Sequence, residues 1–148
     1  MTDAITTAPH GQGRGCVITR RACFSSSHRY WLPELSADDN AARFGSCSMA
    51  PGHGHNYELI VHVTGDIDPE TGYVMDMKIL KDLIKNEVED KMDHKNLNEE
   101  VAEFFDLIPT AENMVVVIYN SLKPHLNPEH TLEVTLYETP RNYVSYSE

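Results

Sequence analysis

Two histidines separated by one glycine, His53-Gly54-His55, are the clearest chemical signal in the sequence. Side chains at positions i and i+2 of a β-strand point to the same side, so both imidazoles can converge on one metal ion. His28 ends another segment with strand-like alternation. If the two strands pair, three neutral imidazoles meet at one end of a sheet, which suits zinc and leaves a fourth coordination position open. The pattern alone also allows half-buried polar histidines that bind no metal.

The elements that must position these histidines are visible in the hydrophobic pattern. Strand-like alternation covers residues 16–28, 53–64, 132–138 and 143–147. Apolar periodicity predicts helices over residues 76–90 and 111–123, the second capped by Thr110. Ser36 can cap a short helix within the long irregular segment 29–52.

The order ββααββ favours an α+β fold, in which a four-stranded antiparallel sheet carries two helices on one face. Four strands leave two open edges, which association with other subunits can close. At 148 residues with 41% hydrophobic side chains, the chain fits one domain. We place this domain at residues 16–148 and expect residues 1–15 to form a flexible N-terminal tail.

Charge and cysteine content narrow the class of protein. The net charge of −11 argues against a broad nucleic-acid surface or a surface for anionic membranes. Arginines gather in residues 1–33, where they either form a local phosphate-binding region or merely aid solubility. No apolar stretch approaches the roughly 20 residues that cross a bilayer. Three irregularly spaced cysteines predict free thiols, and a cytoplasmic protein is expected.

The segment Gly45–Tyr57, GSCSMAPGHGHNY, resembles the Cys-x5-His-Gly-His-Asn-Tyr signature of the 6-pyruvoyl-tetrahydropterin synthases. Other segments match this family in the same order, and they are Phe24–Arg29, Asp68–Gly72, Asp93–Leu97, Pro109–Asn113 and Tyr137–Thr139. Together the matches extend over nearly the whole chain from Cys16 onward. Several ordered motifs are far more specific than any one of them, and they strengthen the prediction of zinc.

The resemblance implies a zinc enzyme that converts 7,8-dihydroneopterin triphosphate to 6-pyruvoyl-tetrahydropterin in tetrahydrobiopterin-type biosynthesis. The reaction eliminates triphosphate and requires no nicotinamide or flavin, and magnesium accompanies the phosphorylated substrate. The implied architecture is the tunnelling fold, in which three subunits close a barrel. Two such rings stack as a homohexamer, with active sites at the subunit boundaries.

By the same resemblance, the zinc ligands are His28, His53 and His55. Cys47 matches the catalytic cysteine of the family, and a thiolate beside a cation is a reasonable base. Asp93 and His94 match its acidic and imidazole partners, and a histidine is suited to relay a proton near neutral pH. Which of these three groups makes each proton transfer stays open.

Glu138 stands out on pattern alone, because a carboxylate at the end of an apolar strand face is costly unless it is paired. It matches the pterin-anchoring glutamate of the family, and its two oxygens suit the exocyclic amine and ring N–H of a pterin together. Thr110 matches the adjoining pterin-binding segment, in which Ala111 stands where relatives often carry a second threonine. A cap role for Thr110 is compatible with binding.

Two alternatives remain from the sequence. A 6-carboxy-tetrahydropterin synthase of queuosine biosynthesis uses the same zinc and substrate but releases a two-carbon fragment. Its usual spacing is Cys-x3-His-Gly-His, whereas five residues separate Cys47 from His53, which favours the pyruvoyl product. The second alternative is a non-catalytic zinc or pterin-binding module on the same scaffold, against which the presence of every motif residue argues.

Overall fold

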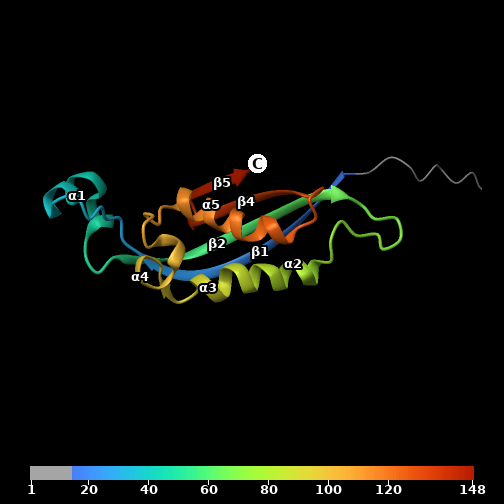
Figure 1. Ribbon diagram of the computed structural model, residues 1–148, viewed down its shortest axis with the longest axis horizontal. Helices are drawn as coiled ribbons and strands as arrows, with labels where there is room; N and C mark the ends of the chain where they lie inside the picture. The colour runs from blue at the N-terminus through green and yellow to red at the C-terminus, as the bar shows by residue number, and fades with distance from the viewer. Residues whose placement is uncertain (1–14) are drawn as a thin grey trace, which may run out of the picture.

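The computed structural model describes residues 15–148, which form a curved sheet with helices on one face (Figure 1). The strands are β1 (Gly15–His28), β2 (His53–Asp66), β3 (Lys95–Asn96), β4 (Thr131–Thr139) and β5 (Asn142–Ser147). Their order across the sheet is β3-β1-β2-β4-β5. The predicted α+β class is confirmed. Of the tail expected over residues 1–15, only Gly15 is described, and it begins β1; residues 1–14 lie outside the described part.

The prediction of a four-stranded, wholly antiparallel sheet was wrong, because it missed β3. This strand pairs with β1 in parallel over two residues, Ser26 with Lys95 and Ser27 with Asn96. The other strand pairs are antiparallel. A strand of two residues is too short to show periodicity in the sequence. It exists because Lys95 and Asn96 pair with β1, which is distant in the chain.

Helix α2 (Met77–Ile84) continues through a π-helical turn η2 (Lys85–Glu89) into α3 (Asp90–Met92), and α5 (Ala111–Leu122) follows later in the chain. Asp76 caps α2 and Thr110 caps α5, each by accepting a hydrogen bond from a backbone N–H. Both predicted helices are therefore present, and Thr110 is the cap that the sequence indicated. In residues 15–148, no helix is long and apolar enough to cross a membrane.

The connection from β1 to β2 projects beyond the end of the sheet (Figure 1). It contains α1 (Ala37–Phe44) and a 3-10 turn η1 (Gly45–Ser48), and Ser36 caps α1 as predicted. The remaining short elements are α4 (Leu97–Glu100), η3 (Ala102–Phe104) and η4 (Lys123–His125). The expected short helix is therefore present in the segment 29–52, a 3-10 turn extends it, and the remaining half of the segment is irregular.

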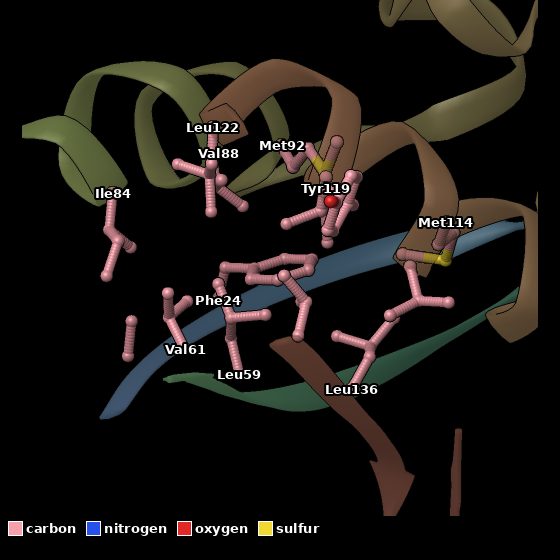
Figure 2. Close-up of a cluster of buried hydrophobic side chains, with 14 of the residues drawn as sticks. Phe24, Leu59, Val61, Ile84, Val88, Met92, Met114, Tyr119, Leu122 and Leu136 are labelled. Carbon is pink, nitrogen blue, oxygen red and sulfur yellow. The ribbon is translucent and has the colours of Figure 1, made fainter. Parts of the chain in front are cut away.

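One apolar core joins the sheet to the helices. Figure 2 shows side chains of β1, β2 and β4 meeting those of η2, α3 and α5, among them Phe24, Leu59, Val88, Met92, Tyr119 and Leu136. Leu59 and Leu136 are paired across β2 and β4 and are fully buried. This packing fixes the two long strands, and with them the strand ends that carry the histidines.

Leu59→Ala should lower the free energy of unfolding by about 2–5 kcal/mol, because it removes buried methyl groups and leaves a cavity. The matched control is Ile79→Ala, whose side chain is 59% exposed on α2. It should change stability by less than about 0.5 kcal/mol. Denaturant unfolding followed by circular dichroism measures both variants, and similar losses in the two would contradict this description of the core.

Candidate metal centre

Antiparallel pairing brings the three predicted metal ligands to one end of the sheet. His28, the last residue of β1, lies directly opposite His53, the first residue of β2. His55 follows two positions later and therefore points to the same side as His53. That side also carries the buried side chains of Tyr57, Leu59, Val61 and Val63. The alternation of the two strands thus places all three imidazoles on the helix-covered face.

The imidazoles are close enough to share an ion. The Nε2 atoms of His28 and His53 are 3.1 Å apart, and one ligand atom from each of the three histidines lies within 4.8 Å of the others. Nitrogens about 2.0–2.1 Å from a tetrahedral zinc stand roughly 3.4 Å apart, so this spacing fits. Among residues 15–148, the Nε2 atom of His55 is buried without a hydrogen-bond partner, a costly arrangement that a bound cation would relieve.

His28 is held in the protonation state that a metal ligand needs. Its side chain is buried, and this burial lowers its pKa to about 4, so the ring is neutral at neutral pH. Its Nδ1 atom lies 2.8 Å from the carbonyl oxygen of Pro109, which can only accept a hydrogen bond. The proton therefore sits on Nδ1, and the lone pair of Nε2 is directed toward the other two histidines.

Glu138 lies beside the histidines rather than at a distance from them. Its Oε1 atom is 3.5 Å from Nε2 of His55 and 3.7 Å from Nε2 of His28. Glu138 also lines a hollow of about 580 Å³, together with Thr110, Glu112 and other residues of α5 and β5. The structure thus brings together Glu138 and Thr110, the two residues that the sequence predicted for substrate binding.

Cys47 lies in η1 as a free thiol of intermediate exposure. Its carbonyl oxygen accepts a hydrogen bond of 2.8 Å from the backbone N–H of Tyr30. The Tyr30 ring packs edge-on against His28, with 5.0 Å between the ring centroids. Cys47 is therefore held near the metal ligands through Tyr30. Cys16 and Cys23 are also free thiols, as predicted.

Asp93 and His94 form an ion pair of 2.9 Å between Oδ2 and Nδ1. The backbone N–H of Ser25 donates to Asp93, which holds the pKa of that carboxyl below its usual range. His94 has a φ of 58°, in the left-handed region, and its side chain is 84% exposed. No hydrogen bond or ion pair among the described residues joins this pair to Cys47.

Two residues at the site were missed by the sequence analysis. Tyr30 and Glu112 line the same hollow as Glu138. Burial and the nearby charge of Glu138 raise the pKa of the Tyr30 phenol. Glu112 belongs to a motif that was recognised, Pro109–Asn113, and its place in the first turn of α5 was a usable signal. For Tyr30 the signal was weaker, namely an aromatic residue two positions after a predicted ligand.

Three histidine ligands beside a hollow lined by carboxylates are typical of a catalytic metal site, in which the fourth coordination position is left to water or substrate. The chain belongs to the 6-pyruvoyl tetrahydropterin synthase family, whose pattern matches residues 17–148.

Individual relatives agree with this assignment. The chain is 43% identical over 138 residues to a 6-pyruvoyl tetrahydrobiopterin synthase of Pongo abelii, a match that covers 92% of this chain and 95% of the relative. The Homo sapiens protein of the same name is 41% identical, with the same coverage. The solved structure of Caenorhabditis elegans 6-pyruvoyl tetrahydropterin synthase superposes with a TM-score of 0.86 at 34% identity, covering 93% of this chain and 99% of that one.

His53→Ala should abolish stoichiometric zinc binding, because two imidazoles cannot hold the ion as three can. The matched control is His62→Ala, also on β2, whose ring is hydrogen-bonded to Thr19 and lies on the opposite face. Elemental analysis of the purified proteins should find about one zinc per chain in the wild type and in His62→Ala. Retention of zinc by His53→Ala would contradict the assignment.

Proposed function

We propose that the protein is a zinc-dependent lyase that converts 7,8-dihydroneopterin triphosphate to 6-pyruvoyl-tetrahydropterin and eliminates triphosphate. The observation that carries this proposal is the hollow beside the three histidines, with the Glu138 carboxylate 3.5 Å from His55. Membership of the family supports it. Magnesium would accompany the triphosphate, and the cytoplasm would keep the free thiols reduced.

In this proposal, one group of residues would bind the metal and transfer protons, and a second group would bind the pterin ring. Zinc on the histidines would supply a Lewis acid for the side-chain hydroxyls of the substrate. Cys47, as a thiolate, would take a proton from a substrate carbon, and His94, oriented by Asp93, would relay protons. Glu138 would accept hydrogen bonds from the exocyclic amine and ring N–H of the pterin, and Thr110 would contribute at the edge of the hollow.

Association of subunits would complete the site. Within residues 15–148, the edge of β1 that faces away from β2 pairs with β3 only at Ser26 and Ser27. At the opposite side of the sheet, β5 is the edge strand. Open edges of this kind pair with other chains, which supports trimeric barrels stacked as a hexamer. The exposed His94 has no hydrogen bond to Cys47 among the described residues, which supports active sites at subunit boundaries, where another subunit supplies one of these two residues.

Cys47→Ala should lower kcat by at least about 100-fold, because a positioned base contributes factors of this size. Its zinc content should not change. Cys23→Ala, on the exposed face of β1, is the matched control and should retain activity. The assay incubates the zinc-loaded full chain with 7,8-dihydroneopterin triphosphate and identifies products by mass.

Three outcomes of this assay would contradict the proposal. Release of a two-carbon fragment would indicate the 6-carboxy product instead, and the absence of triphosphate release would indicate a non-catalytic module. Normal turnover by Cys47→Ala would remove the base assignment.

Glu138→Gln should weaken binding of a non-reacting pterin, such as neopterin, by about 10- to 100-fold, because charge-assisted hydrogen bonds become neutral ones. The matched variant is Glu112→Gln, which alters the other carboxylate of the hollow and should change affinity by less than about threefold. Fluorescence titration measures both, and zinc content should be unaffected. The reverse order of effects would move the pterin anchor to Glu112.

A further inference from the structure

Arg29 follows the metal ligand His28 directly, and its side chain reaches the turn that carries Cys47. Its Nε–H donates a hydrogen bond of 2.6 Å to the carbonyl oxygen of Ser48. Ser48 is buried, so its carbonyl has few other partners available. One residue further along, Tyr30 donates its backbone N–H to the carbonyl of Cys47. Arg29 and Tyr30, the two residues after His28, thus donate hydrogen bonds to the backbone carbonyls of Ser48 and Cys47.

The orientation of Arg29 is itself fixed on two sides. Its guanidinium lies over the Trp31 ring, with 3.8 Å from Cζ to the ring centroid. Its backbone is held by Asn98, whose Oδ1 accepts from the Arg29 N–H at 2.8 Å and whose Nδ2 donates to the Arg29 carbonyl at 3.0 Å. Because its guanidinium plane and its backbone are already held, Arg29 loses little further conformational freedom when it donates the hydrogen bond to Ser48.

The far end of the same turn also lies against His28. Gly52 has a φ of 103°, and a Cβ at this position would lie 2.5 Å from the carbonyl oxygen of His28. Only glycine adopts this conformation and permits this approach without strain. The segment from Cys47 to Gly52 is therefore tied to the end of β1 by Arg29, by Tyr30 and by a close backbone contact.

We propose that Arg29 is a positioning residue for Cys47. Its guanidinium fixes the turn that carries the thiol relative to the strand end that carries His28, and so sets where the thiol stands relative to the metal. Asn98 acts through Arg29 by holding its backbone. This proposal rests on the proposed function, in which Cys47 takes a proton from a substrate held at the metal. Chemistry of that kind is sensitive to displacements of about 1 Å.

The test compares Arg29→Met, which keeps the aliphatic stem, with Arg29→Lys, which keeps a donor and the charge. The matched control is Arg21→Met, because Arg21 lies on β1, the strand that Arg29 follows, and makes an exposed ion pair of 2.6 Å with Glu58. For each zinc-loaded full chain, kcat and KM are measured with 7,8-dihydroneopterin triphosphate, together with zinc content. Hydrogen exchange of the peptides covering Tyr30 and residues 45–50 is measured in parallel.

Arg29→Met should lower kcat by about 10- to 100-fold and change KM by less than about threefold, with unchanged zinc content. Exchange in the Cys47 turn should accelerate by about tenfold. Arg29→Lys should recover kcat to within about threefold of the wild type, and Arg21→Met should behave as the wild type. If Arg29→Met does not fold, Asn98→Asp replaces it, since it keeps the acceptor for the Arg29 N–H but puts a repelling carboxylate oxygen in place of the donor to the Arg29 carbonyl, and it should lower kcat by about threefold or more.

An unchanged kcat in the folded Arg29→Met, or in Asn98→Asp where that variant replaces it, would overturn the proposal. A loss of kcat that tracks zinc loss, or that Arg29→Lys does not recover, would overturn it as well. The hydrogen-exchange measurement distinguishes failure of the positioning role of Arg29 from failure of the proposed function. If the wild type shows no turnover at all, the proposed function fails, while unchanged exchange in the Cys47 turn of Arg29→Met would still refute the positioning role.

Discussion

The antiparallel register of β1 with β2 runs without interruption from Gly15 opposite Asp66 to His28 opposite His53. Because side chains alternate across a strand, a shift of this register by one residue would turn His28 away from the other two imidazoles. The same register places Phe24 beside Tyr57 in the core, where their rings stack 5.0 Å apart. Core packing and metal-site geometry are therefore two consequences of one pairing.

Segments far apart in the chain are attached to this strand end. The carbonyl of Pro109, just before α5, fixes the proton on His28. Glu138, at the end of β4, stands against the open side of the histidines. Cys47 is attached through the residues that follow His28. The start of a helix, the end of a strand and the turn that carries Cys47 are thus arranged around a single buried imidazole.

Much of this arrangement could be predicted from local sequence. The His-Gly-His pattern reveals the convergence of two ligands because strand alternation is a local property, and the cap at Thr110 is equally local. The recruitment of His28 required the family resemblance, since strand pairing is not encoded in spacing. The two-residue strand β3 and the bond from Arg29 to Ser48 could not be predicted, because contacts between distant segments create them. The long connection before β2 was expected to be largely irregular, yet Ser36 correctly marked its helix.

In the proposed centre, three imidazoles and no thiolate hold the metal, and Cys47 stays outside the coordination sphere. X-ray absorption spectroscopy at the zinc edge of the zinc-loaded, full-length protein tests it most directly. The proposed ligand set predicts three nitrogen neighbours of zinc at about 2.0–2.1 Å, with oxygen at the remaining coordination position. A sulfur neighbour at about 2.3 Å, or a shell made only of oxygens, would contradict it.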